Sequence, residues 1–346
     1  MRARELPAEW ARQDGILLTW PHAQGDWGDD LPAVEQAFVA IAAAAARHER
    51  VLIACHDPAH RQRIAGLLAD EAVPANRIVL ALAPSNDSWA RDHGPITVLD
   101  NGHPRLLDFR FNGWGGKYPA DLDDAVTRKL ADQGVFGDTP LETVDLVLEG
   151  GAIDTDGRGA LLATRRSIVS EARNPGLDQA AMEAMLARHL GVRRFLWLEH
   201  GRLAGDDTDG HIDTLARFCD EHTIAYVACE DRADTQHDEL AAMADELHAL
   251  RTATGEPYRL VPLPLPKPCY GSTGQRLPAT YANFLIVNGA VLVPVYHDPA
   301  DAIALERLGG CFPDRRLVPI DCRALIGQNG SLHCVTMQLP VGVLMT

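Results

Sequence analysis

The sequence lacks the features that mark secreted and membrane-spanning proteins. No apolar run reaches the roughly 18 residues that cross a bilayer, and residues 1–5 open no apolar signal segment. The seven cysteines are scattered and form no Cys-x-x-Cys pair. This usage is typical of reduced thiols in a cytoplasm and not of a disulfide framework or a zinc knuckle. We therefore expect a cytoplasmic protein.

Motifs for nucleotides and metal ions are also missing. No glycine-rich strand-to-helix turn and no His-Glu-x-x-His occur, and residues 206–213 do not complete a calcium loop of the EF-hand type. Positive charge is scarce, since 32 Lys and Arg face 48 Asp and Glu, for a formal net charge of −16. This balance disfavours nucleic acid and anionic membranes as partners and favours cationic ligands. We expect no cofactor and no bound metal.

The apolar residues are numerous enough to build a large core. Of the 346 residues 46% are hydrophobic, and no long linker or low-complexity segment divides the chain, which predicts a single domain over residues 1–346. Helical periodicity covers residues 32–48, 57–72, 121–132, 177–190, 237–251 and 299–308. Strand-like runs cover residues 51–55, 78–82, 96–99, 106–111, 144–148, 223–229, 258–263 and 335–339. Two strands often precede a helix, which predicts an α/β fold other than a doubly wound parallel sheet.

The clearest local pattern is a hairpin over residues 284–293. Asn288-Gly289 lies between two apolar runs, and both residue types tolerate positive φ. This dipeptide is typical of a two-residue turn between antiparallel strands.

Cys334 is the candidate nucleophile. Most free cysteines are structural, but Cys334 follows the flexible polar loop 327–331 and precedes a strand-like run. A loop on a rigid scaffold is a common location for a reactive side chain. The other six cysteines lack such a setting and are interpreted as packing residues.

Two acidic clusters offer partners for this thiol. His211-Ile212-Asp213 would place both polar side chains on one face if the segment is extended, and Asp207 lies just upstream. Asp87, Trp89, Arg91 and Asp92 form the second cluster, in which an extended backbone would point Arg91 and Asp92 in opposite directions. Helix caps and simple ion pairs are the structural alternatives. A third, weaker signal is Glu149 before two glycines, where the backbone can approach closely.

Taken together, these motifs resemble the agmatine deiminase family, also labelled Porphyromonas-type peptidyl-arginine deiminases. The matching segments are Glu9-Trp10, Thr19-Trp20-Pro21 and residues 87–95, 111–118, 149–151, 208–213, 281–284, 312–315 and 330–334. The resemblance implies the pentein β/α-propeller, with five pseudo-symmetric strand-rich units, peripheral helices and a central polar pocket. It also implies a possible homodimer. The chain departs from the commonest family pattern at Ser88, His93 and Ser331.

Roles are implied residue by residue. Cys334 matches the nucleophile, His211 the general acid and base, and Asp92 and Asp213 the carboxylates that hold the guanidinium. Further substrate contacts are expected from Asp87, Trp89, Trp114, Glu149 and Asp207. The implied reaction hydrolyses agmatine to N-carbamoylputrescine and ammonia through a covalent amidino-thioether.

Three alternatives stay open. A deiminase of free or peptide-bound arginine would need a cation for the α-carboxylate, for which Arg110 and Lys117 are candidates. A metal-dependent hydrolase would use His211, Asp213 and His333. A non-catalytic binder of cationic ligands is the third.

Overall fold

The strands of the protein form five separate sheets in a computed structural model that describes residues 4–344. The strands are β1 (Arg4–Glu5), β2 (Gln13–Thr19), β3 (Arg50–Cys55), β4 (Ile78–Leu82), β5 (Ile96–Asp100), β6 (His103–Arg110), β7 (Leu141–Val147), β8 (Asp154–Thr155), β9 (Ala160–Thr164), β10 (Arg194–Leu198), β11 (Ala216–Asp220), β12 (Thr223–Val227), β13 (Arg259–Leu263), β14 (Leu285–Val287), β15 (Ala290–Val295), β16 (Arg316–Asp321) and β17 (Thr336–Pro340). The sheets run β17-β2-β3-β4, β1-β5-β6-β7, β10-β9-β8, β11-β12-β13 and β14-β15-β16.

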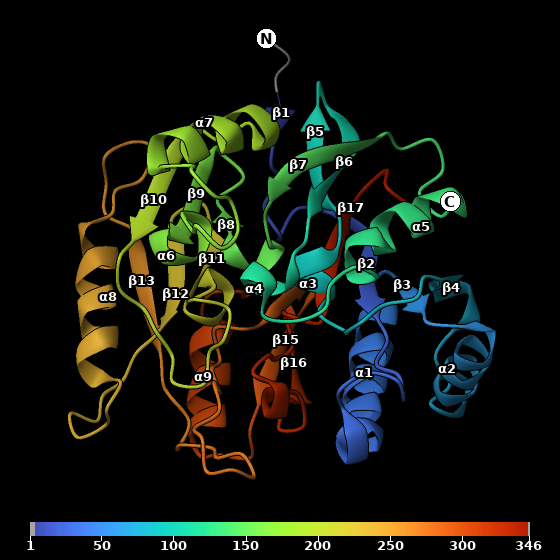
Figure 1. Ribbon diagram of the computed structural model, residues 1–346. Helices are drawn as coiled ribbons and strands as arrows, with labels where there is room; N and C mark the ends of the chain where they lie inside the picture. Colours follow the sequence, from blue (N-terminus) through green and yellow to red (C-terminus); the bar gives the residue numbers. More distant parts are fainter. Residues whose placement is uncertain (1–3, 345–346) are drawn as a thin grey trace.

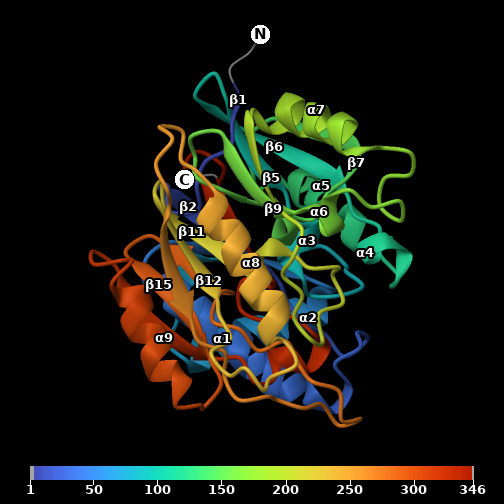
Figure 2. The ribbon, with the colours of Figure 1, turned by 90° about the vertical axis from the view of Figure 1, so that its left-hand side faces the viewer.

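Helices surround these sheets and also enter the space between them. The helices are α1 (Leu31–Ala46), α2 (Pro58–Asp70), α3 (Ala90–His93), α4 (Gly113–Gly116), α5 (Val126–Asp132), α6 (Arg165–Ile168), α7 (Gln179–Leu190), α8 (His237–Ala249) and α9 (Ala300–Gly309), together with the 3-10 turns η1 (Gly28–Asp30), η2 (Ala75–Arg77), η3 (Asp123–Ala125), η4 (Gly150–Ala152), η5 (Ile212–Thr214) and η6 (Leu325–Gln328). The long helices α1, α2, α8 and α9 lie at the periphery, whereas the short α3 and α4 lie in the middle (Figure 1). Turned by 90°, the molecule shows α8 outside the sheet that holds β11 and β12 (Figure 2).

One pairing pattern recurs in all five sheets. Each sheet contains an antiparallel pair that is continued by a parallel pair: β17·β2 then β2·β3, β5·β6 then β6·β7, β8·β9 then β9·β10, β11·β12 then β12·β13, and β14·β15 then β15·β16. A parallel neighbour needs a crossover connection, and long helices such as α1, α7, α8 and α9 provide it. The predicted α/β class and its strand-strand-helix order are therefore confirmed.

The local sequence signals explain how several helices begin and end. Asp57 caps α2 by accepting a hydrogen bond from His60 N at 2.8 Å, and Asp178 caps α7 in the same way from Ala181 N at 2.9 Å. Gly191 ends α7 in the left-handed region, at φ 75°. All six predicted helices are present, with ends shifted by a few residues.

The predicted hairpin is present, but its turn differs from the expectation. β14 and β15 pair antiparallel around Asn288-Gly289, and only Gly289 has positive φ, at 74°. The Asn288 side chain instead accepts from Gln13 N at 3.1 Å and donates to Gln13 O at 2.7 Å. Asn288 therefore ties the hairpin to the start of β2.

Two segments beside the pocket described below are not extended, so the condition under which their side-chain directions were considered is not met. Ile212–Thr214 forms a 3-10 turn rather than an extended strand, and Arg91 and Asp92 belong to the short helix α3. Arg91 and Asp92 still point apart, because successive side chains on a helix are separated by about 100°.

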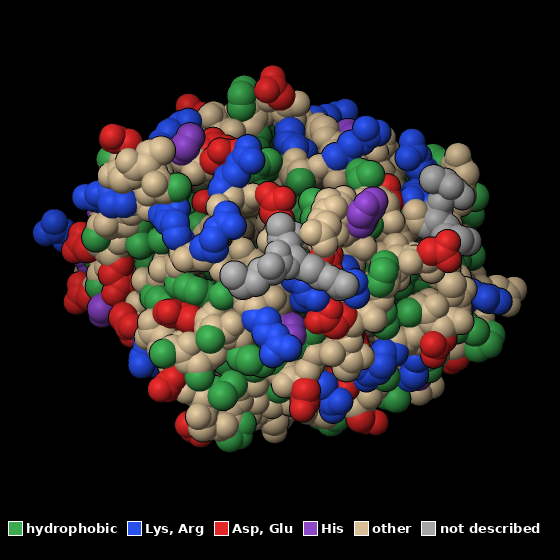
Figure 3. Space-filling view, turned by 90° about the horizontal axis from the view of Figure 1, so that it is seen from above, with side chains coloured by type: hydrophobic (Ala, Val, Ile, Leu, Met, Phe, Trp, Pro, Cys, Tyr) green, Lys and Arg blue, Asp and Glu red, His purple; other side chains and the backbone are tan. Residues whose placement is uncertain are grey.

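The surface and the helices give two further observations. Basic and acidic side chains are interspersed over the face seen in Figure 3, so the acidic surplus does not form one patch there. Within residues 4–344, no helix combines the length and apolarity needed to cross a membrane.

Candidate active site

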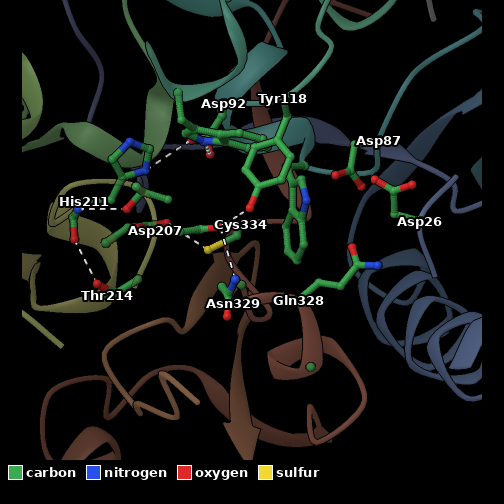
Figure 4. Close-up of a pocket in the computed structure, with 16 residues that line it drawn as sticks. Asp26, Asp87, Asp92, Tyr118, Asp207, His211, Thr214, Gln328, Asn329 and Cys334 are labelled. Carbon is green, nitrogen blue, oxygen red and sulfur yellow. Dashed lines mark hydrogen bonds and ion pairs between the residues drawn. The ribbon is translucent and has the colours of Figure 1, made fainter. Parts of the chain in front are cut away.

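A cavity is lined by loops and short helical segments from several parts of the chain, and Cys334 lies in its wall. The lining residues are Asp26, Asp87, Trp89, Asp92, Trp114, Tyr118, Asp207, Thr208, His211, Asp213, Thr214, Gly327, Gln328, Asn329, Gly330 and Cys334. Figure 4 shows His211 and Thr214 on one side of Cys334, with Asp26 and Asp87 on the other. We call Cys334, His211, Asp92 and Asp213 the floor, because all four are buried, and Asp26, Asp87, Asp207 and Tyr118 the mouth, because all four are partly or fully exposed.

The loop that carries Cys334 is held against an aromatic side chain. A Cβ on Gly330 would lie 2.1 Å from the Trp89 ring, so only glycine permits this contact. Downstream, Cys334 Sγ lies 3.3 Å from Asn283 Nδ2 and 3.6 Å from Asp213 Oδ2. Burial, followed by the charges of Asp213 and Asp92, raises the pKa of the Cys334 thiol well above its ordinary value.

His211 lies between two carboxylates of other segments. Its Nδ1 is 3.6 Å from Asp92 Oδ1, and its Nε2 is 3.3 Å from Glu149 Oε2. Burial alone would lower the pKa of His211, but the carboxylates of Asp92 and Glu149 outweigh burial and raise it to about 9. His211 is therefore an imidazolium at neutral pH and can donate a proton.

Asp92 is held in place by two hydrogen-bond donors and by the backbone of Gly151, which packs closely against its carboxylate. Gly151 N donates to Asp92 Oδ1 and Trp114 Nε1 to Asp92 Oδ2, both at 3.0 Å. A Cβ on Gly151 would lie 2.6 Å from His211 Nδ1 and 2.8 Å from Asp92 Oδ1, so this approach requires glycine. Burial is the main reason that the pKa of Asp92 is raised, to about 6, and the nearby Asp213 adds to the effect.

The two oxygens of Asp213 differ in their partners. Oδ2 lies 2.8 Å from His333 Nδ1, whereas Oδ1 is buried and has no hydrogen-bond partner among residues 4–344. Burial would raise the pKa of Asp213, but His333 and His211 hold it below its usual value. Asp213 is therefore an ionised carboxylate in the wall of the cavity, and a guanidinium N–H is a suitable donor to it.

The mouth carboxylates are less enclosed than the floor carboxylates, and their hydrogen-bond partners are fewer or more exposed to solvent. Asp207 Oδ2 accepts from Tyr118 Oη at 2.9 Å and from Asn329 Nδ2 at 3.1 Å. Asp87 Oδ1 accepts from Ser88 N at 2.7 Å, and burial raises the pKa of Asp87 to about 6. These groups would meet the part of a ligand that extends away from Cys334.

Most residues predicted for the site line the cavity, and one does not. The lining residues among them are Cys334, His211, Asp213, Asp92, Asp87, Trp89, Trp114 and Asp207. Glu149, expected to contact substrate, lies behind His211 and accepts from Arg173 Nε at 2.7 Å. The two cations considered for a substrate carboxylate do not line the cavity either. Arg110 faces Asp124 at 3.5 Å, and Lys117 donates to Asp209 at 3.0 Å.

The sequence interpretation missed several residues of the site. Asn283 contacts Cys334, and Tyr118 belongs to the mouth, although both lie in segments that carried the family resemblance. His333 was considered only as a metal ligand, yet it contacts Asp213 and Glu9. Asp26 had no signal beyond its charge. Across residues 4–344, no three or more His, Cys, Asp or Glu side chains gather in a way that could hold a metal ion.

Comparisons with known proteins show which sequences and structures this chain is similar to. The family model described as Porphyromonas-type peptidyl-arginine deiminase matches residues 5–340. The chain is 34% identical to an agmatine deiminase of Stutzerimonas stutzeri, over 97% of the chain and 95% of the relative. Among solved structures, a candidate arginine deiminase from Porphyromonas gingivalis is 50% identical, with a TM-score of 0.93 over 99% of the chain and 100% of that structure. A cysteine-to-serine variant of the C. jejuni agmatine deiminase with substrate bound is 35% identical, with a TM-score of 0.91 over 98% of the chain and 97% of that structure.

Proposed function

The chain belongs to the Porphyromonas-type peptidyl-arginine deiminase family, as its motifs predicted, and we propose that it is an agmatine deiminase that forms N-carbamoylputrescine and ammonia. The predicted enzyme class, a hydrolase of C–N bonds in linear amidines, is confirmed by its relatives. The five sheets are, on this proposal, the blades of a pentein β/α-propeller that functions as one domain. The recurrent antiparallel-then-parallel pairing supports that interpretation.

The choice of agmatine over arginine rests on the charges of the cavity. Among the described residues that line it, none is Lys or Arg, whereas the mouth carries three aspartates. The α-carboxylate of arginine would meet acidic groups there without a cation to bind it. The primary ammonium of agmatine instead gains favourable interactions with the same carboxylates.

The floor can perform the chemistry in two stages. Asp92 and Asp213 hold the guanidinium, and the Cys334 thiolate attacks its central carbon to give a tetrahedral adduct. His211 donates its proton to the departing ammonia, leaving an amidino-thioether on Cys334. Water, deprotonated by His211, then adds to the same carbon, and the C–S bond breaks to release the ureido product and the thiol.

Formation of the thiolate depends on the substrate in this proposal. A thiol with a free pKa of about 8.5 needs roughly 2 kcal/mol to ionise at pH 7, and the raised pKa of Cys334 makes the cost larger. A cation about 4 Å away contributes at most ~4 kcal/mol at an effective dielectric near 20. We expect an inert cationic analogue to lower the pKa of Cys334 in an ultraviolet thiol titration. An unchanged pKa would refute this step.

One assay tests the function. Ureido product is measured from agmatine, arginine and an arginyl peptide, with wild type, Cys334→Ala and the control Cys55→Ala, whose thiol is buried in β3. We expect turnover of agmatine in wild type and in the control, with at least about a 10⁴-fold loss in Cys334→Ala.

The same assay separates the alternatives. Faster turnover of arginine or the peptide would overturn the substrate assignment. Loss of activity in a chelator, with Cys334→Ala still active, would favour a metal-dependent hydrolase. No ureido product from any guanidine would favour a binder. Cytoplasmic location and a homodimer stay predictions, which fractionation and light scattering would check.

A further inference from the structure

A line of buried hydrogen bonds runs behind Cys334. His333 Nδ1 lies 2.8 Å from Asp213 Oδ2, and His333 Nε2 lies 2.7 Å from Glu9 Oε2. Glu9, Asp213 and His333 are all at least 95% buried. The Glu9–His333–Asp213 line therefore ends 3.6 Å from Cys334 Sγ without His333 itself lining the cavity.

The number of protons on the His333 ring follows from the groups to which its two nitrogens are hydrogen-bonded. Ionised carboxylates only accept hydrogen bonds, and a neutral imidazole has one donor nitrogen and one acceptor nitrogen. Glu9 also accepts from Ile286 N at 2.7 Å and from Arg217 Nη2 at 2.5 Å, which favours its ionised form. Two carboxylates at hydrogen-bond distance from both nitrogens of His333 therefore require a proton on each nitrogen.

The charges around His333 agree with this count. The buried carboxylates near it are Glu9, Asp213 and Asp154, from the N-terminal segment, η5 and β8. The buried cations are Arg217 on β11 and Arg91 on α3, whose Nε donates to His333 O at 3.4 Å. The His211 imidazolium faces Asp213 as well, and a proton on each nitrogen of His333 completes the hydrogen bonds of Glu9 and Asp213 within this buried network.

We infer that His333 is a positioning residue that carries a proton on both ring nitrogens, holds Asp213 by Oδ2, and sets its positive charge against the carboxylate that contacts Cys334 Sγ. The catalytic part of this inference rests on the proposed deiminase function. The protonation state itself does not depend on any turnover.

Two variants of His333 separate the contributions of its two ring nitrogens, because each keeps the hydrogen-bond donor of only one of them. His333→Asn keeps an N–H donor near the position of Nδ1, toward Asp213. His333→Gln keeps a donor near the position of Nε2, toward Glu9. Both variants remove the charge. His189→Gln is the matched control, because His189 also faces a carboxylate, Glu142 at 3.4 Å, but lies away from the cavity.

The rate at which iodoacetamide alkylates Cys334, measured as a function of pH, reports on the positive charge of His333. The neutral reagent reacts with the thiolate, so its rate follows the ionised fraction. We expect the rate at pH 8 to fall at least about tenfold in both variants, with the inflection displaced to higher pH. The His189→Gln control should behave as wild type. Wild-type profiles in both folded His333 variants would overturn the inference.

Steady-state kinetics with agmatine report on whether His333 holds the Asp213 carboxylate in position. We expect His333→Asn to keep KM near the wild-type value while kcat falls. In His333→Gln, kcat/KM should fall by a further 10- to 100-fold or so, because the hydrogen bond to Asp213 is lost. Equal losses in the two variants would show that His333 does not orient Asp213.

Nitrogen-15 NMR of the wild-type protein needs neither variant to be active. We expect both ring nitrogens of His333 to have shifts of protonated nitrogens at pH 7, with the signal assigned by specific labelling if His333→Gln does not fold. One unprotonated nitrogen at pH 7 would overturn the inference. Failure of the agmatine assay with this signature intact would refute the proposed function alone.

Discussion

The floor and the mouth of the cavity both present carboxylates, but they hold them in different ways. Asp92 and Asp213 on the floor are almost fully buried, and each has partners from other segments. The mouth aspartates are partly or fully exposed, and the Asp207 carboxylate contacts the exposed Tyr118. The floor is therefore arranged in advance for one geometry, whereas the mouth side chains lie next to solvent and are held by fewer buried contacts.

This difference in how the carboxylates are held assigns the chemical step to the floor and the selection of the substrate to the mouth. A reacting group must be held within a fraction of an ångström, which needs rigid supports such as Gly151 and Trp114. Recognition of a distant ammonium needs only negative potential, which partly exposed carboxylates supply at smaller energetic cost. Changes on the floor should therefore reduce kcat, and changes at the mouth should raise KM.

The largest effect expected within this comparison of floor and mouth tests the division directly. Asp213→Asn removes the charge that faces the guanidinium, and we expect kcat/KM for agmatine to fall by about 10²- to 10³-fold, mostly in kcat, because charge-assisted hydrogen bonds contribute about 1.5–3 kcal/mol each. Asp207→Asn is the matched change at the mouth and should raise KM by about tenfold or less. Steady-state kinetics measure both. Equal losses in kcat would show that the floor and the mouth do not differ as proposed.

The pH profile of kcat/KM tests the floor alone. Asp92, with a pKa raised to about 6, must lose its proton to bind the cation, so activity should rise as pH increases through 6. His211, with a pKa raised to about 9, must keep its proton to release ammonia, so activity should fall above 9. The Cys334 thiol, whose pKa is raised, must also lose its proton and adds to the rise, so we expect activity at pH 5 to be more than about tenfold below the maximum. Loss of the acid limb in Asp87→Asn would assign that limb to the mouth instead.

Local signals made much of the architecture predictable from sequence. The periodic helices have N-caps such as Asp57 and Asp178, which directly precede the helices that they begin. Several strands were not predicted, among them β2, β9, β10, β11 and β16, and in β11 Arg217 interrupts the apolar pattern. That arginine is nevertheless buried, since it pairs with Glu9, which is 208 positions away in the chain.

The candidate site likewise contains residues that the sequence predicted and contacts that it could not predict. Cys334, His211, Asp92 and Asp213 were predicted because their types and motifs match a known chemistry, and all four line the cavity. The contacts of His333 could not be predicted, because its partners lie 120 and 324 positions away. Only folding shows which charges compensate one another.

The smallest effect we predict is on stability and concerns the mouth. Burial raises the pKa of Asp87 from 3.8 to about 6, so the folded state binds this proton more tightly than the unfolded state does. The stability that Asp87 contributes is present below pH 3.8 and is lost as pH rises through about 6. Asn cannot ionise and can still accept from Ser88 N, so Asp87→Asn should be more stable than wild type by ~1–2 kcal/mol at pH 8, and this gain should vanish near pH 4. Urea unfolding at the two pH values, with exposed Asp138→Asn as control, measures the difference. A gain that is the same at both pH values would show that the mouth keeps its charge without cost, as a fully solvated carboxylate does.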